Sequence, residues 1–306
     1  MKPTFRGWIL VVAVLSGCGT RTTAPSAPAP VSPRSGVTGS GVTLDESLLG
    51  RQIFPADNWW NLDVTTAPID PNSQAIIDWI SGRTPSNPTA TRRLHPDFGP
   101  SPYGIPYVVV PGTQALRSVF FSPYGAQSDV GAPGRPPGYP IPDEAYQQPN
   151  YLEGGAAGGG ASGDRHLLVI DRDHDLLFET WATSWNASAQ RWEAGSGAAW
   201  DLATNGRRPE GWTSADAAGL AILPGLVRAD EVYGPDEIHH AFRFTTRGTS
   251  GHVWPASHET TPLEGAPPMG TRLRMKASVD LSIYPPEMQK IFRADEALRA
   301  DPRRQR

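Results

Sequence analysis

The sequence predicts a mainly β protein: a single antiparallel β-sandwich or jelly-roll-like domain with a few short helices. Short apolar segments follow one another along the chain, and several alternate with polar residues as half-buried strands do. Glycine and proline, 32 residues each, separate these segments as turn formers. The chain shows no internal repeat and no regular alternation of strands and helices, which argues against an α/β fold.

The first strong signals after residue 44 are a short helix and a β-hairpin. Residues 71–80 predict a helix that begins at Pro71 and buries its apolar face. Residues 107–110 and 118–121 predict strands. The clearest hairpin joins a strand at 166–171 to one at 176–183.

The remaining strands are expected between residues 192 and 281. One covers 194–201, and Ser214 caps a helical turn soon after it. Alternating residues predict further strands at 238–246 and 252–254, and the most regular at 270–281. An amphipathic helix is expected over residues 286–299.

The N-terminus has the features of an export signal. Residues 1–17 hold two basic residues, Lys2 and Arg6, followed by an apolar run at 8–15 that is too short to span a bilayer. Small residues at 16–17 follow the run and lead to Cys18, the single cysteine of the chain. Residues 15–18 resemble the bacterial lipobox, and this resemblance implies that the cysteine is lipidated.

The domain organisation follows from this signal. A tether rich in proline, serine and threonine covers residues 18–43, the folded domain covers 44–300, and 301–306 form a basic tail. The expected product is an exported lipoprotein of the cell envelope, attached to a membrane through its lipid. Because residue 19 is glycine rather than aspartate, its resemblance to sorted lipoproteins implies the outer membrane or cell surface.

Net charge limits the choice of partners. The formal charge is −4, with no excess of lysine and arginine. Binding to nucleic acid depends on clustered basic residues that neutralise phosphates, so no nucleic-acid partner is expected. The ten tryptophans instead suit a polysaccharide, since aromatic rings can cover sugar faces, although a tryptophan in a β-rich protein is more often a core residue.

Several phrases occur together in this chain. They read GWTSADAAG at 211–219, HAFRFT at 240–245, VWPASH at 253–258 and PPMG at 267–270. With these phrases the chain resembles a family of uncharacterised secreted bacterial proteins. The resemblance covers most of the mature domain and implies secretion, but it implies no activity.

Residues 211–281 hold four of the seven histidines together with several carboxylates, so a site is expected here. Acid–base chemistry uses imidazoles and carboxylates that converge in a cleft. The candidate catalytic residues are Asp216, Glu231, His240 and His258. Three of them also have a structural alternative: Asp216 can cap a turn, Glu231 can lie in a solvated turn, and His240 can be a core histidine.

The expected substrate-binding residues are tryptophans and basic side chains that would line a groove for an acidic polymer. They are Trp181, Trp212, Trp254, Arg243, Arg272, Arg274 and Lys276. A glycosidase or a lyase acting on uronates would suit such a groove. The alternative for the basic strip at 272–276 is a solvated outer strand face.

The sequence leaves open whether the protein is an enzyme. It lacks a GxSxG nucleophile motif and an HExxH metal motif, so no metal site is expected and no cofactor is indicated. The first hypothesis is glycan hydrolysis or lyase chemistry. The alternative is a non-catalytic glycan-binding or envelope-structural lipoprotein.

Overall fold

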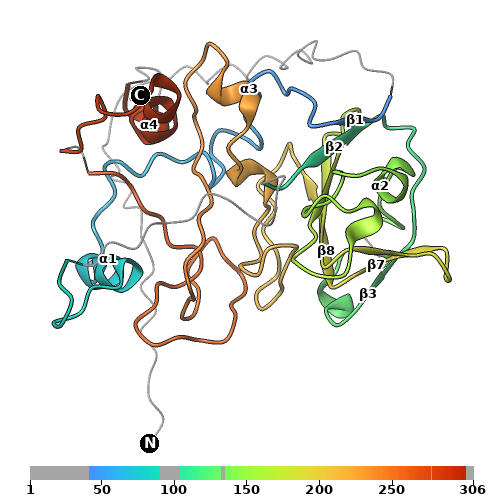
Figure 1. Cartoon of the computed structure of the whole chain (residues 1–306), viewed down its shortest axis with the longest axis horizontal. Helices are drawn as coiled ribbons and strands as arrows, with labels where there is room; N and C mark the ends of the chain where they lie inside the picture. Colours follow the sequence, from blue (N-terminus) through green and yellow to red (C-terminus); the bar gives the residue numbers. More distant parts are fainter. Residues whose placement is uncertain (1–40, 90–103, 132–134, 277, 301–306) are drawn as a thin grey trace, which may run out of the picture. The chain divides into compact units, whose positions relative to one another are not determined.

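The computed structural model describes residues 41–89, 104–131, 135–276 and 278–300, with side chains described up to residue 294 (Figure 1). The chain divides into two compact units, residues 1–36 and 37–306, and every described residue belongs to the second. The signal peptide, Cys18 and the basic tail 301–306 lie outside the described residues, as does nearly all of the tether.

The larger sheet has five strands, in the order β1-β2-β4-β5-β8. Their bounds are β1 Thr43–Leu44, β2 Tyr107–Val110, β4 Leu167–Asp171, β5 Leu176–Trp181 and β8 Ser196–Asp201. The predicted hairpin is confirmed as β4 and β5, which pair antiparallel, with Leu167 opposite Thr180. The β2 and β4 strands pair parallel, whereas the other neighbours are antiparallel.

The smaller sheet has three strands in the order β3-β7-β6. They are β3 Val119–Phe121, β6 Ser184–Asn186 and β7 Arg191–Ala194, and β3 pairs parallel with β7. The protein is therefore a single domain of two mixed sheets with short helices, and the expectation of purely antiparallel sheets was wrong. Parallel neighbours need a long connection, and the chain between β2 and β4 provides one. A sandwich or jelly roll stays a prediction.

The helices are short apart from the last. The α-helices are α1 Ser73–Ser81, α2 Glu144–Gln147, α3 Ala229–Val232 and α4 Pro286–Ala300. The 3-10 turns are η1 Gly125–Gln127, η2 Ala157–Gly159 and η3 Leu223–Gly225. The two helices predicted over 71–80 and 286–299 are confirmed, although α1 has no fully buried residue. No helix in the described part of the chain combines the length and apolar character that a membrane crossing requires.

The larger sheet is buried on both faces. Along β2, Val108 and Val110 belong to one apolar cluster, which also contains Phe121 and Trp192 from the smaller sheet. Tyr107 and Val109 belong to the other cluster, which continues into residues 218–223. The strands are therefore continuous apolar runs rather than alternating ones, and polar groups with access to solvent must come from the loops.

Three expected strands in the last third of the chain are wrong. The described residues of 238–246, 252–254 and 270–281 form no ladder; they contain single bridge residues such as His252, which pairs with Met269. The physical reason is that this part of the chain bonds to several separate loops instead of one partner strand. The Ala241 amide donates to the Trp60 carbonyl at 2.8 Å, the Arg243 amide donates to the Gly225 carbonyl at 2.9 Å, and the Arg274 side chain donates to the Val64 carbonyl at 2.5 Å.

Candidate functional site

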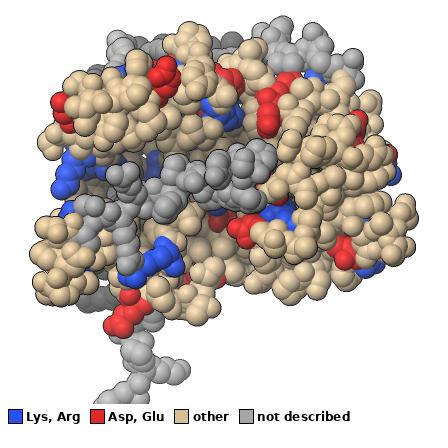
Figure 2. Space-filling model, in the orientation of Figure 1, with Lys and Arg blue, Asp and Glu red and all other residues tan. Residues whose placement is uncertain are grey.

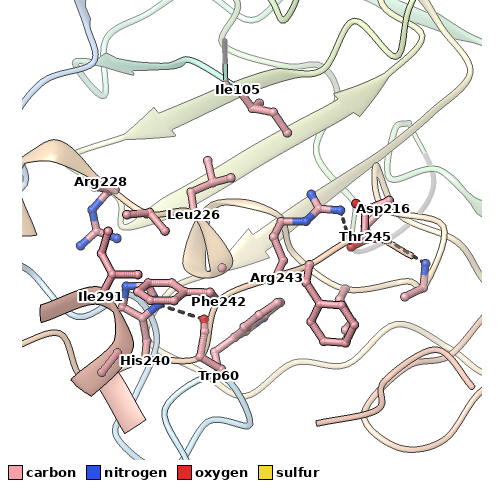
Figure 3. A pocket seen from close by; sticks show the side chains of 18 of the residues that line it. Trp60, Ile105, Asp216, Leu226, Arg228, His240, Phe242, Arg243, Thr245 and Ile291 are labelled. Carbon is pink, nitrogen blue, oxygen red and sulfur yellow. Dashed lines mark hydrogen bonds and ion pairs between the residues drawn. The ribbon is translucent and has the colours of Figure 1, made fainter. Parts of the chain in front are cut away.

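A large groove lies beside the apolar cluster that contains Tyr107. Its volume is about 2100 Å³, and its described walls come from loops on both sides of the cluster, among them residues 150–155, 225–230, 240–249 and 267–275. Small-molecule pockets usually have volumes of about 300–1,000 Å³. Figure 3 shows part of this groove, where Arg243 points toward Asp216. The size of the groove suits a segment of a polymer.

The turn that carries Asp216 is tightly hydrogen-bonded to itself, and residues 213–219 are called the Asp216 turn below. The Ser214 hydroxyl donates to the Leu220 carbonyl at 2.6 Å and accepts the Asp216 amide at 2.9 Å. The Asp216 carboxylate accepts the Ala218 amide at 3.0 Å. Ser214 therefore stabilises a turn, as expected of a capping residue, but no helix follows it.

Gly219 closes the Asp216 turn in a left-handed conformation, with φ of 71°. A Cβ added there would lie 2.0 Å from Ser257 Oγ and 2.6 Å from the Trp212 carbonyl. We expect Gly219→Ala to lower the free energy of unfolding by about 2–5 kcal/mol, measured by urea denaturation. Gly211→Ala is the matched control, because its φ is also positive but nothing lies within 4 Å. That variant should cost only about 1–2 kcal/mol, and equal losses in the two would contradict the close approach.

Three side chains from distant parts of the sequence contact the Asp216 turn. His166 Nε2 lies 3.2 Å from the Ala215 carbonyl, Arg243 donates to Asp216 Oδ2 at 3.1 Å, and His258 Nδ1 lies 2.7 Å from the Ala217 carbonyl. Two of the predicted catalytic residues, Asp216 and His258, therefore lie close together. His166 was missed, because the sequence analysis placed it only at the start of a predicted strand.

His258 has one ring nitrogen available for chemistry. A carbonyl only accepts hydrogen bonds, so Nδ1 must carry the proton that it shares with Ala217. The neutral ring then has its lone pair on Nε2, which has no hydrogen-bond partner among the described residues. The ring is partly exposed and packs edge-on against Tyr124, with centroids 6.4 Å apart. His258 can therefore accept a proton.

His166 and Glu153 form a buried pair beside the same turn. His166 Nδ1 lies 2.6 Å from Glu153 Oε2, and both side chains are less than a tenth exposed. Burial acts to raise the pKa of Glu153, but the hydrogen bond with His166 and the charges of His166 and Arg243 outweigh it, so the pKa lies below its ordinary value. Glu153 is therefore a carboxylate.

The other two predicted catalytic residues lie in a separate ion cluster. His240 Nε2 is 3.0 Å from Glu231, and His240 Nδ1 is 3.0 Å from the Ala241 carbonyl. Arg228 donates to the same Glu231 carboxylate at 2.5 Å. Glu231 and His240 are both buried, and neither imidazole nitrogen is left to exchange a proton with a substrate. His240 matches its alternative as a core histidine bonded to backbone, whereas the alternative of a solvated turn was wrong for Glu231, which is buried in α3.

Glu179 is a buried acid that the sequence did not single out. It lies on β5 and is fully buried, and its carboxylate accepts the amides of Ile222 and Leu223 at 2.9 Å. The Trp200 indole also donates to it, at 3.2 Å. Burial raises its pKa from 4.5 to about 7, against the lowering effect of these hydrogen bonds. Through these hydrogen bonds, Glu179 anchors Ile222 and Leu223, which follow the Asp216 turn, to the larger sheet.

The three predicted tryptophans differ in their surroundings. Trp254 is 62% exposed and packs edge-on against Trp59, which lines the groove, at 6.1 Å between centroids. The Trp181 indole donates to Asp164 at 3.1 Å, and the Trp212 ring stacks on the Arg135 guanidinium at 4.3 Å. Trp254 is thus the one of the three with a large open ring face.

The predicted basic strip does not form a charged strand face. Arg272 donates to the Leu62 carbonyl at 2.9 Å, and Arg274 donates to the Val64 carbonyl at 2.5 Å. Both line the groove, but these contacts hold its wall together. Lys276 is exposed, while Arg243 faces the carboxylate of Asp216. Figure 2 likewise shows mostly uncharged surface, with acidic and basic residues interspersed.

Comparison of the chain with protein-family models, curated proteins and solved structures finds no significant match. The resemblance to secreted bacterial proteins therefore stays a prediction. The function is inferred from the groove, the Asp216 turn and the side chains around it.

Proposed function

We propose that this protein is carbohydrate-active: its groove binds a polysaccharide segment, and His258 and Asp216 supply acid–base chemistry for glycan cleavage. The observation that carries the proposal is the groove of about 2100 Å³, one wall of which includes Asp216. Several threonines line it together with apolar residues, including Trp59 and Trp60, which are each only 7% exposed. Such a mixture of apolar side chains and hydroxyls suits sugars, which present both apolar faces and hydroxyl groups.

His258 is the proposed base, because its Nε2 lone pair is available. It does not itself line the groove, but it contacts Ala217, and the neighbouring residues Asp216 and Ala218 do line it. Arg243 holds Asp216 as its ion-pair partner at 3.1 Å. Either hydrolysis or lyase elimination needs a group that accepts a proton beside the substrate.

The charged residues of the groove narrow the class of glycan that it can bind. Asp45, Asp216 and Asp230 line it together with Arg228 and the other arginines. The three aspartates offset most of the charge of the four arginines that line the groove. Arg272 and Arg274 keep their charge but already direct N–H groups to backbone carbonyls. We therefore favour a neutral or weakly acidic glycan.

Export and anchoring belong to the same proposal. The N-terminal signal and Cys18 support a lipid-anchored envelope protein, placed at the outer membrane or cell surface, where polysaccharides are accessible. The resemblance to secreted bacterial proteins supports this location. The apolar cluster shared by the two sheets, with Val169 and Phe178 on one and Phe121 and Trp192 on the other, supports a β-sandwich.

The test is a screen of neutral and acidic polysaccharides for binding and for released products. We expect cleavage of at least one glycan, and a fall of about 10²–10⁴-fold in rate for His258→Ala with binding retained. His174→Ala is the matched control, because His174 is an exposed histidine that pairs with Asp171 in the β4–β5 turn. That variant should keep full activity. Neither binding nor products with any glycan would overturn the proposal.

The second candidate function is glycan binding without catalysis. It is favoured because the Asp216 carboxylate already accepts hydrogen bonds from Arg243 and from the Ala218 amide. The exposed ring of Trp254 beside Trp59 would then act as a binding platform. Binding that weakens in Trp254→Ala, without products from the unmodified protein, would establish this candidate in place of the first.

A further inference from the structure

We propose that Glu153, Asp164 and His166 form a binding site for a divalent transition-metal ion. One ligand atom from each of the three residues can be chosen so that all lie within 4.8 Å of one another. Ligand atoms bound to one ion at about 2.0–2.2 Å lie up to about 4.4 Å apart, so a shared ion would need these atoms to shift by only a few tenths of an ångström. The proposal rests on this cluster alone and does not depend on glycan cleavage.

The backbone already holds the segments in place. The Glu153 amide donates to the His166 carbonyl at 3.0 Å, and the His166 amide lies 3.3 Å from Glu153 Oε2. Asp164 is two residues before His166, just ahead of β4. Because these contacts belong to the fold, binding an ion would require little rearrangement of the chain.

The hydrogen bonds of His166 orient it as a ligand. If Nε2 donates its proton to the Ala215 carbonyl, at 3.2 Å, the lone pair of the neutral ring lies on Nδ1. Nδ1 then faces Glu153 Oε2 at 2.6 Å, so two electron-rich atoms are in contact and need a positive charge between them. A second proton can supply that charge, and so can a metal ion. A ring N–H that donates to a backbone carbonyl is the usual support of a metal-binding histidine.

Asp164 completes the ligand set from the solvent side. Its Oδ1 accepts the Trp181 indole proton at 3.1 Å, which fixes the direction of the carboxylate. Its Oδ2 makes no hydrogen bond to any described residue and can bind an ion. Because Asp164 is exposed, an ion held here would keep positions open to water or to a substrate.

The donor chemistry indicates the class of ion. One imidazole nitrogen and two carboxylates suit Zn²⁺, Mn²⁺ or Fe²⁺, whereas Ca²⁺ and Mg²⁺ prefer oxygen ligands alone. Two carboxylates also bring enough negative charge to balance a divalent ion.

A second histidine with two carboxylates provides the contrast. His252 Nε2 lies 2.5 Å from Glu210, and its Nδ1 lies 2.8 Å from Glu259. The two acids meet opposite sides of the ring, so they cannot share one ion with it. His252 therefore matches the composition of the proposed site but not its geometry.

The test is titration of the full chain, freed of metal with EDTA, with Zn²⁺ by calorimetry and with Mn²⁺ by electron paramagnetic resonance. We expect one ion per chain. Asp164→Asn should lower the affinity at least about tenfold, because even the loss of a group that only supports a ligand costs that much. Asp164→Asn is a mild change, because the exposed amide can still accept the Trp181 proton. His166→Ala should abolish binding, and His252→Ala should leave it unchanged.

Three outcomes would overturn the proposal. The first is no binding at millimolar Zn²⁺ or Mn²⁺. The second is an affinity that Asp164→Asn leaves intact, and the third is a loss of binding equal in His252→Ala and Asp164→Asn. If His166→Ala fails to fold, as judged by circular dichroism, the comparison between Asp164→Asn and His252→Ala still decides the matter.

Discussion

Arg228→Met is expected to lower the free energy of unfolding by about 3–5 kcal/mol. The Arg228 side chain is 2% exposed, and it donates to Glu231 at 2.5 Å and to the Arg51 carbonyl at 2.9 Å. Asp230 lies 3.4 Å away. Removing the cation leaves two carboxylates buried together with only His240 to balance them, and uncompensated buried charge is costly.

Urea denaturation at neutral pH measures this effect. Arg117→Met is the matched control, because Arg117 also bonds an acid, Asp143, at 2.5 Å, but both side chains are almost half exposed. Exposed pairs contribute at most about 1 kcal/mol, so this variant should change stability little. The double variant Arg228→Met/Glu231→Leu should recover part of the loss. Similar losses in Arg228→Met and Arg117→Met would contradict the burial of the cluster.

The free energy of unfolding is also expected to fall as the pH rises through the range set by Glu179. Burial raises the pKa of Glu179 from 4.5 to about 7, so the folded state holds this proton more tightly than the unfolded state does. The stabilisation is fully present below pH 4.5 and is lost as the pH passes about 7. At about 1.4 kcal/mol per pKa unit, the loss is about 3 kcal/mol.

Denaturation between pH 4 and pH 8 measures this slope. Glu179→Gln should remove it, since the amide does not titrate in this range. The amide NH₂ would also meet the Ile222 and Leu223 amides, which are donors, so the variant should lose a further ~1–3 kcal/mol. Glu193→Gln, a change at a partly exposed acid of β7, should leave the slope intact. A slope that persists in Glu179→Gln would show that other groups cause it.

The sequence predicted the central elements well. The β2 strand, the β4–β5 hairpin and the helices α1 and α4 all follow from local patterns, because their periodicity and turn residues act over a few positions. The parallel pairing of β2 with β4 could not be predicted in this way. It depends on how the residues between these strands cross over, which no short segment encodes.

The expected strands after residue 238 failed for a different reason. Their alternation is real, but Arg272 and Arg274 donate to backbone carbonyls of residues 62–65 instead of facing solvent. The sequence does not show whether a long arginine side chain is solvated or bound to a carbonyl 210 residues away. The alternation of apolar and polar residues therefore reflects these side-chain contacts, and the backbone forms no ladder.

For the candidate site, the sequence by itself indicated the segment around Asp216 and the histidine at 258. These positions stand out in the sequence because many titratable residues lie between glycine and proline turns there. Only the tertiary structure decided which of them meet: His166, Arg243 and His258 reach the Asp216 turn, while Glu231 and His240 pair with Arg228. The buried pair of Glu153 and His166 was equally invisible to sequence reasoning. Acid–base and metal chemistry depend on distances of a few ångströms, and such distances arise when segments far apart in the chain pack together.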